Sequence, residues 1–441
     1  MPGLQTTIAA LARQRKQWDS FLRMMPGAGQ SQERGAVPSR LTEVTGFGSN
    51  PGNLRMFEYV PKKPRKSLVV VLHGCTQTAA SYDLGAGWST LADRYGFMLL
   101  CPEQRAENNP KTCFNWFRES DIVRGGGEAA SIREMISRMA SDHDVDPRRV
   151  FITGLSAGGA MTAVMLATYP EVFAGGAIIA GLPYRSATSM RQALESMFSV
   201  KVRTPHEWGD LVRAASPHRG PWPRVSVWHG GADTVVKPRN AEELLKQWTD
   251  VHGLSTQPDR TETVDGYPRH VWSNAAGEDV IESYTIPLMA HGAPVASGDG
   301  DTSYGVPGEY LIEVGISSSY HIARFWGLTD SRRTPWPMRP DAGTADTSAA
   351  STTASKAAPK ADDAPPRPSR LPERVEVIEP GPDDILPPKS GRRGAEQQHG
   401  AGGHGWSADR DGEKERQAGV SRFVEDTIKR ALEAAGLMKR R

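Results

Sequence analysis

A serine flanked by two glycines is the feature of this chain whose residue types and spacing are best suited to chemistry. Residues 154–158 read Gly-Leu-Ser-Ala-Gly, with a strand-like run at 149–153 before them and a helix-like run at 160–166 after them. Glycines allow a sharp turn there, and backbone N–H groups at the start of a helix favour a developing negative charge. Ser156 is therefore predicted to be a nucleophile, the alternative being a glycine-rich turn without catalytic function.

A nucleophilic serine needs a base, and the base needs an acid that orients it. Residues 224–230 read as a buried strand, and Asp233 follows that strand in a loop. Ligand sites of open α/β sheets form beyond the carboxyl ends of strands. Further along, residues 281–286 alternate like a strand and lead to His291 beside a glycine. The chain order serine, acid, histidine thus predicts a triad of Ser156, Asp233 and His291.

Other histidines and aspartates compete for these two roles. His229 and His73 lie beside glycines at strand ends, a placement that suits walls of a cleft better than a base. His321 lies within an expected helix and is predicted to be structural. The rival aspartates occur in turn-like sequences, where no catalytic explanation is needed: Asp265 and Asp279.

A loop after another buried strand offers an oxyanion hole. Residues 67–72 form a continuous apolar, β-branched run that is typical of a buried parallel strand, and Cys75 follows shortly after it. In hydrolases with a serine elbow, one N–H comes from such a loop and the other from the residue after the nucleophile. The backbone amides of Cys75 and Ala157 are the predicted donors; a simple strand-ending turn is the alternative.

Several separated blocks of the sequence resemble the esterase family that includes short-chain polyhydroxyalkanoate (poly-3-hydroxybutyrate) depolymerases, over roughly residues 42–330. The resemblance implies an α/β-hydrolase fold, the triad named above and a short-chain ester or polyester substrate. The alternation of strands and helical runs independently predicts an α/β class with a mostly parallel sheet and helices on both faces. Feruloyl and acetyl-xylan esterases share much of the pattern, which leaves the substrate open. The resembling blocks are residues 72–77, 95–104, 113–117, 126–132, 154–161 and 180–184.

The resembling blocks contain two of the three cysteines and two aromatic candidates for substrate binding. Some members of that family have a disulfide that braces the active-site loop, which allows a bridge between Cys75 and Cys113; in a reducing compartment both would be thiols. Trp116 and Tyr184 are candidates for an apolar acyl-binding groove. Aromatic side chains more often pack into a core, and that alternative stays open.

Length and charge limit the classes of protein. A chain of 441 residues can hold one large α/β domain with extensions, here expected at residues 42–335. The net charge of +2, from 53 basic and 51 acidic residues, gives no electrostatic case for nucleic acid. There is no run of about 18 apolar residues, so no transmembrane segment is predicted. Residues 1–30 read as an amphipathic helical segment rather than a secretory signal, which favours a cytoplasmic or granule-associated protein, although family members are often extracellular.

The C-terminal part has a different composition. Residues 340–415 are rich in Pro, Ala, Ser and Thr and are predicted to be a disordered linker. Residues 416–441 are predicted to form an amphipathic helix. Such a helix could dock on its own domain or self-associate, which we favour, or lie on a lipid or polymer granule. Its apolar stripe comprises Val420, Phe423, Val424, Ile428, Ala431, Leu432 and Ala435.

The sequence as a whole predicts a serine esterase that transfers an acyl group from substrate to Ser156 and then to water, without metal or cofactor. The favoured substrate is a short-chain (poly)hydroxyalkanoate-type ester, and a feruloyl, acetyl-xylan or other small ester is the alternative. A non-enzymatic alternative is a granule- or surface-binding protein that uses a hydrolase fold as a platform. The apparent triad argues against this last alternative.

Overall fold

The structure is a computed structural model that describes residues 39–329. The predicted amphipathic segment at residues 1–30, the linker at 340–415 and the helix at 416–441 lie outside the described residues. Within the described part, no helix has both the length and the apolar character needed to cross a membrane.

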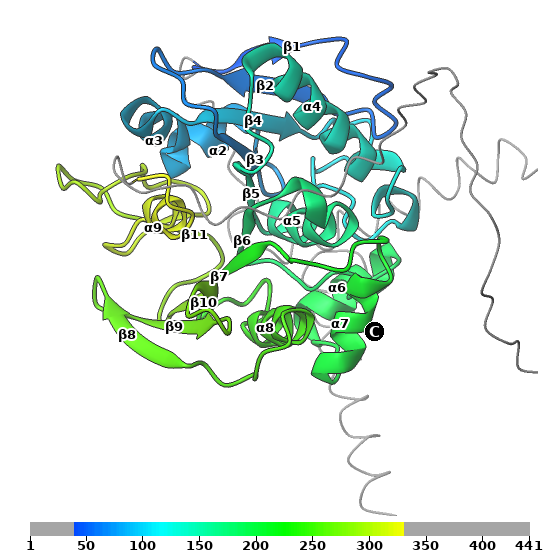
Figure 1. Ribbon diagram of the computed structural model, residues 1–441, viewed down its shortest axis with the longest axis vertical. Coiled ribbons are helices and arrows are strands. Elements are labelled where there is room, and N and C mark those ends of the chain that lie inside the picture. Colours follow the sequence, from blue (N-terminus) through cyan, green and yellow to red (C-terminus); the bar gives the residue numbers. More distant parts are fainter. Residues whose placement is uncertain (1–38, 330–441) are drawn as a thin grey trace, which may run out of the picture. The chain divides into compact units, whose positions relative to one another are not determined.

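A ten-stranded sheet forms the centre of this domain (Figure 1). Its order is β1-β2-β4-β3-β5-β6-β7-β10-β9-β8. The strands from β4 to β10 in this order pair in parallel, and the pairs at both edges are antiparallel. The strands are β1 (Thr42–Val44), β2 (Arg55–Tyr59), β3 (Leu68–Leu72), β4 (Met98–Glu103), β5 (Val150–Leu155), β6 (Gly175–Ile179), β7 (Arg224–Gly230), β8 (Arg260–Val264), β9 (Tyr267–Ser273) and β10 (Asp279–Ile286). Two short strands, β11 (Ala293–Val295) and β12 (Leu311–Glu313), pair separately.

Helices cover both faces of the sheet (Figure 1). On one face lie α2 (Ala79–Ala86), α3 (Trp88–Tyr95) and α9 (Ser318–Phe325). On the other lie α4 (Gly127–His143), α5 (Ala157–Thr168), α6 (Met190–Phe198), α7 (Pro205–Arg213) and α8 (Arg239–Val251). Two 3-10 turns, η1 (Glu119–Asp121) and η2 (Pro170–Val172), complete the connections.

The central strand β3 shows why the sequence folds into three layers. Successive side chains of a strand point to opposite faces, and a parallel strand covered on both sides must be apolar throughout. All five residues of β3 are buried. Leu68, Val70 and Leu72 pack into the core beneath α4, α5 and α8, whereas Val69 and Val71 pack against α2, α3 and α9. The predicted fold class, a mostly parallel sheet with helices on both faces, is confirmed.

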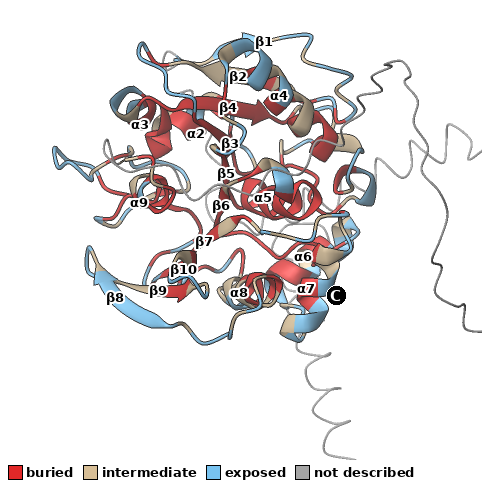
Figure 2. Cartoon of the chain, viewed as in Figure 1, coloured by how far each residue is buried: buried red, intermediate tan, exposed pale blue. Residues whose placement is uncertain are grey.

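One edge of the domain differs from this pattern. In β8 all residues except the last are exposed, and the β8–β9 hairpin extends the sheet beyond the helical layers (Figure 2). Charged and hydroxyl side chains on β8 keep this edge strand polar, which discourages pairing with another chain. The buried centre of the sheet lies instead around β3, β5, β6 and β7.

The parallel register brings the carboxyl ends of four strands to one edge. Leu72 of β3 lies beside Gly154 of β5, and Leu155 lies beside Ile179 of β6. Ile179 in turn lies beside Trp228 of β7. The loops that leave β3, β5, β7 and β10 therefore begin close to one another, although they are far apart in the sequence. These loops carry the residues predicted to do chemistry.

Candidate active site

Ser156 occupies the sharp turn between β5 and α5. Its backbone has φ 57° and ψ −114°, a conformation that is rare for a residue with a side chain. Two hydrogen bonds hold it: the Ser156 N–H donates to the carbonyl of Ile179 at 2.8 Å, and the Ala160 N–H donates to the carbonyl of Ser156 at 2.9 Å. The turn places the hydroxyl at the N-terminus of a fully buried helix.

The two glycines around Ser156 are required by close packing rather than by their own dihedral angles. A Cβ atom on Gly154 would lie 2.4 Å from the backbone of Gly158, and one on Gly158 would lie 2.3 Å from the carbonyl oxygen of Leu72. Both contacts involve backbone, which cannot move aside without shifting the start of α5 or the end of β3. The sequence Gly-Leu-Ser-Ala-Gly therefore lets α5 begin directly against the end of β3.

The structure brings Ser156, His291 and Asp233 together. His291 Nε2 lies 2.9 Å from Ser156 Oγ, and His291 Nδ1 lies 2.7 Å from Asp233 Oδ2. A carboxylate can only accept, so Nδ1 carries the imidazole proton and Nε2 is free to accept the proton of the serine hydroxyl. All three residues are buried, with His291 7% and Ser156 8% exposed. This arrangement can remove a proton from Ser156 as its oxygen attacks an electrophile.

Asp233 is held by hydrogen bonds at both carboxylate oxygens. Oδ1 accepts the backbone N–H groups of Val235 at 2.8 Å and Val236 at 2.9 Å. Oδ2 lies 2.7 Å from His291 Nδ1 and 3.3 Å from Nε2 of a second histidine, His229. Burial alone would raise the pKa of Asp233, but the hydrogen bonds from His229 and His291 lower it well below its ordinary value. The carboxylate therefore stays ionised and keeps the His291 ring oriented.

The loop after β3 lies against the serine turn and is tied to a second loop. Cys75 forms a disulfide with Cys113, which resolves the alternative that the sequence left open, whereas Cys101 is a free, buried thiol. The Gly74 N–H donates to Gln77 Oε1 at 2.8 Å, which fixes the start of this loop. The disulfide thus connects the predicted oxyanion loop with the segment that carries Trp116.

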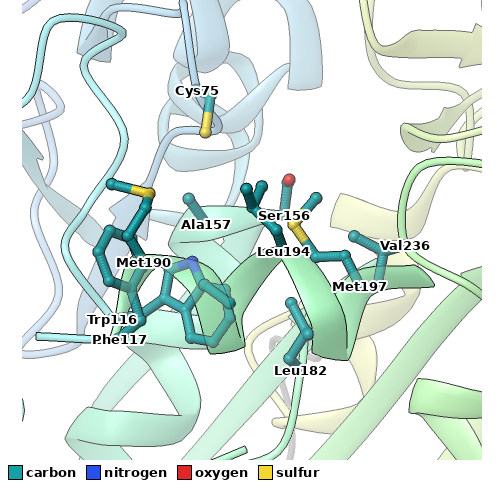
Figure 3. A pocket seen from close by; sticks show the side chains of 11 residues that line it. Cys75, Trp116, Phe117, Ser156, Ala157, Leu182, Met190, Leu194, Met197 and Val236 are labelled. Carbon is teal, nitrogen blue, oxygen red and sulfur yellow. The ribbon is translucent and has the colours of Figure 1, made fainter. Parts of the chain in front are cut away.

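An apolar cavity opens beside Ser156 (Figure 3). The predicted substrate-binding residue Trp116 lines it and is 5% exposed. Ser156 also lines this cavity, and so do Cys75 and Ala157, the two residues predicted to form the oxyanion hole. Its walls carry no charged side chain, so the space suits an uncharged group. The remaining wall residues are Phe117, Leu182, Met190, Ala193, Leu194, Met197 and Val236.

A second cavity lies on the histidine side of Ser156. His291 and Tyr310 line it, and their rings meet edge to face with centroids 5.9 Å apart. Cys75 and Ser156 border both cavities. The serine hydroxyl therefore stands between an apolar space and a space that contains the imidazole.

Two residues named from the sequence lie elsewhere than expected, and a third is structural as predicted. Within residues 39–329, Tyr184 lines neither cavity; its hydroxyl donates to the carbonyl of Ile122 at 3.3 Å in the core. His73 is not a cleft wall either, because its buried ring donates from Nδ1 to the Gly74 carbonyl and accepts the Gln104 N–H. His321 Nε2 lies 2.7 Å from Asp265 Oδ2, and His321 makes no hydrogen bond to Ser156, Asp233 or His291, which agrees with the prediction that it is structural.

Sequence reasoning missed several residues that the site contains. Most come from α6, which lies in the connection between β6 and β7 and supplies Met190, Leu194 and Met197 to the apolar cavity. An amphipathic pattern identifies the buried side of such a helix but not the surface that the side covers. Tyr310 was missed because it lies in a loop with no motif.

A buried carboxyl group supports the segment around Cys113. Glu128 accepts hydrogen bonds from the side chain of Gln104 at 2.6 Å and from the side chain and backbone of Asn115 at 2.7 and 2.8 Å. Burial and the nearby charge of Asp121 raise the pKa of Glu128 to about 8, against the opposing effect of these hydrogen bonds. The segment 113–117, whose Trp116 and Phe117 line the apolar cavity, thus rests on a buried carboxyl group with a raised pKa.

Known proteins match the chain over the domain just described. The sequence profile of the family described as esterase PHB depolymerase matches residues 59–263. Poly(3-hydroxyalkanoate) depolymerase C of Paucimonas lemoignei is 48% identical over 291 residues, which cover 65% of this chain and 70% of that protein. An acetylxylan esterase of Coprinopsis cinerea is 36% identical over 268 residues, covering 58% of this chain and 70% of that protein.

A comparison with a solved structure supports the fold described above. The acetyl xylan esterase from Aspergillus awamori superposes with a TM-score of 0.55 at 26% identity, covering 65% of this chain and 99% of that one. These relatives are carboxylic ester hydrolases, and their similarity sets aside the non-enzymatic platform that the sequence alone allowed. The chain is an α/β-hydrolase and belongs to the esterase family of PHB depolymerases.

Proposed function

We propose that this esterase hydrolyses short-chain hydroxyalkanoate-type esters, with Ser156 as nucleophile, His291 as general base and Asp233 as the acid that orients His291. The observation that carries the proposal is the pair of hydrogen bonds at 2.9 and 2.7 Å that joins the three side chains beside an apolar cavity. The identity of 48% to a poly(3-hydroxyalkanoate) depolymerase supports the substrate class.

In the proposed reaction, Ser156 Oγ attacks the ester carbonyl carbon while its proton moves to His291 Nε2. The oxyanion accepts hydrogen bonds from the backbone amides of Cys75 and Ala157; within residues 39–329 neither amide donates to another protein group. His291 then gives the proton to the alkoxide that leaves. A water molecule, activated by His291, then attacks the acyl-enzyme in the same way and releases the carboxylic acid product. Loss of one oxyanion donor should lower kcat by about 100- to 1,000-fold.

The two cavities suggest how an ester lies across the serine. The leaving oxygen must reach His291 Nε2, so the alcohol portion belongs in the cavity that His291 and Tyr310 line. The acyl portion then lies in the apolar cavity with Trp116. Because no charged side chain lines that cavity, short, uncharged acyl groups fit it best.

A second candidate is an acetylxylan esterase, favoured by the 36% identical relative and by the TM-score of 0.55 to a solved acetyl xylan esterase. Comparing kcat/KM for a 3-hydroxybutyrate trimer, acetylated xylan and methyl ferulate would separate the candidates. We expect the trimer to be preferred by at least tenfold. Faster acetate release from xylan would replace the proposed substrate class while leaving the serine mechanism intact. Granule binding by residues 416–441 remains a prediction that concerns residues outside the described part of the chain.

A further inference from the structure

We propose that His229 is a positioning residue that supports the same carboxylate oxygen of Asp233 that His291 contacts, and that it stabilises the negative charge of this carboxylate. This inference rests on the proposed function, because it concerns the acid of the same triad. His229 is the penultimate residue of β7, and Asp233 follows in the loop that leaves this strand. The His229 side chain is 1% exposed and that of Asp233 is fully buried.

The proton of the His229 ring can be assigned from its surroundings. Nε2 lies 2.8 Å from the carbonyl oxygen of Val236, and a carbonyl oxygen can only accept. Nε2 therefore carries the proton. The other nitrogen, Nδ1, is buried and meets no hydrogen-bonding group among residues 39–329, so a proton there would have no acceptor. The ring N–H is therefore directed at the Val236 carbonyl, and Nε2 also lies 3.3 Å from Asp233 Oδ2.

This geometry places two imidazole N–H groups beside Asp233 Oδ2, with nitrogen–oxygen distances of 2.7 and 3.3 Å. His291 approaches from the loop after β10, and His229 from the end of β7, which pairs with β10 in parallel. Within the described residues, these two side chains are the titratable groups that act on Asp233. The same His229 N–H also holds Val236, whose own N–H donates to Asp233 Oδ1 at 2.9 Å. His229 therefore ties together both sides of the carboxylate.

Two effects on catalysis follow. First, the carboxylate cannot rotate away from His291 without losing its other donors, so the imidazole is held in line with Ser156. Second, the nearby N–H of His229 stabilises the negative charge of Asp233, which moderates the stabilisation that Asp233 gives to protonated His291. Removing the His229 N–H should loosen the triad and concentrate the negative charge on the contact with His291.

The test uses three variants of the full chain and a soluble p-nitrophenyl ester. His229→Phe fills the same space without a donor, and His229→Gln keeps an N–H at nearly the position of Nε2. His252→Gln is the matched control, because Nε2 of this histidine also meets a backbone carbonyl, that of Pro223 at 3.0 Å, but has no contact with the triad. We expect His229→Phe to lower kcat by about 10- to 100-fold, the effect of losing a hydrogen bond to a charged group, with little change in KM.

The pH profile distinguishes positioning from simple support of the fold. For His229→Phe, we expect the midpoint of the acid limb of kcat/KM, which reports protonation of the base in the free enzyme, to move upward by about half a pH unit or more. His229→Gln should restore the midpoint and most of kcat, and His252→Gln should change neither. An unchanged midpoint in His229→Phe, or His229→Gln no better than His229→Phe, would overturn the inference.

A second readout does not depend on the proposed function. The proton on His291 Nδ1 should give a downfield NMR resonance that moves further downfield in His229→Phe, because its acceptor becomes more negative. If the wild-type protein hydrolyses no ester, the proposed function fails and this resonance still decides the question. A resonance that is the same in wild type and His229→Phe would contradict the role of His229.

Discussion

His291 Nε2 lies 2.9 Å from the hydroxyl oxygen of Ser156, although 135 positions separate the two residues in the chain. The parallel pairing of β5, β6, β7 and β10 makes this contact, because it brings the loops after β5 and β10 to one edge of the sheet. Ser156 stands in a strained turn, and His291 lies in a loop without regular structure. The contact between these two side chains therefore depends on the strand pairing in the sheet rather than on the local sequence around either residue.

Replacing the nucleophile should separate chemistry from stability. Ser156→Ala removes a single hydroxyl and should lower kcat on a soluble ester by about a million-fold, as loss of a triad nucleophile does. The melting temperature should stay close to that of wild type, because the turn is held by backbone hydrogen bonds. Steady-state kinetics with calorimetry check both expectations. Activity within tenfold of wild type would rule out Ser156 as the nucleophile.

The orienting acid can be tested without removing its bulk. Asp233→Asn keeps the shape of the side chain but loses the charge and can present an N–H toward His291, which favours the wrong tautomer. We expect kcat to fall by about 10,000-fold. His321→Ala is the histidine control, since its ring meets Asp265 rather than the triad, and should keep kcat within a few-fold. A dead His321→Ala with an active His291→Ala would reverse the assignment of the base.

The disulfide should contribute both to stability and to the geometry of the oxyanion loop. Cys75 and Cys113 are 38 positions apart, and closing a loop of that length stabilises a folded protein by about 4 kcal/mol in the chain-entropy account. We expect the double variant Cys75→Ser/Cys113→Ser to unfold at lower urea concentration and to lose activity. Reductant should destabilise the wild type and leave the double variant unaffected. Equal sensitivity of the two proteins would contradict this prediction.

The apolar cavity should set the preferred acyl length. Leu194 on α6 lines this cavity, and Leu194→Trp would fill part of it. One methylene in a hydrophobic pocket is worth about 1–3 kcal/mol, so we expect the ratio of kcat/KM for p-nitrophenyl butyrate to that for the acetate to fall by at least tenfold. Arg191→Gln, on the exposed side of the same helix, should leave the ratio unchanged. A constant ratio in Leu194→Trp would place the acyl group elsewhere.

Glu128 should make stability depend on pH. The pKa of its buried carboxyl is raised from 4.5 to about 8, so between these values the folded protein keeps a proton that the unfolded chain has lost. The free energy of unfolding should therefore decrease as pH rises through this window, by at most about 1.4 kcal/mol per unit. The Glu128→Gln variant has no ionisable group at this position. Its free energy of unfolding minus that of wild type should therefore increase from pH 5 to pH 9. Urea unfolding at both pH values tests this prediction, and Glu195→Gln, at an exposed position, is the control. If the free energy of unfolding changes with pH by the same amount in wild type and both variants, the prediction is wrong.

Much of the fold was predictable because local patterns and the fold agree. The apolar runs at β3, β5 and β7 are buried on both faces, and such runs in a sequence predict a parallel sheet. The glycines around Ser156 were informative for a similar reason, since only glycine fits where α5 meets the end of β3. Chain order then sufficed to select Asp233 and His291 as the residues that the structure brings to Ser156.

Other features could not be predicted, because they depend on which side chains meet across the folded domain. Nothing in the local sequence shows that His229 turns toward Asp233, or that Tyr184 points into the core toward Ile122. The contribution of α6 was hidden likewise, because its apolar side could cover any part of the sheet. Such contacts between distant segments are set by packing, and periodicity within one segment carries little information about them.

The position of α6 has a consequence for how such an enzyme can change. The strands β5, β7 and β10 carry the three residues proposed to break the ester, whereas Leu182 and the α6 wall belong to the stretch between β6 and β7. A large part of the apolar wall therefore lies on a different piece of chain from the proposed reacting groups. Grafting residues 182–204 from an acetylxylan-cleaving relative should transplant substrate preference while the reacting groups stay in register, so this stretch is the natural unit for recombination and for directed evolution.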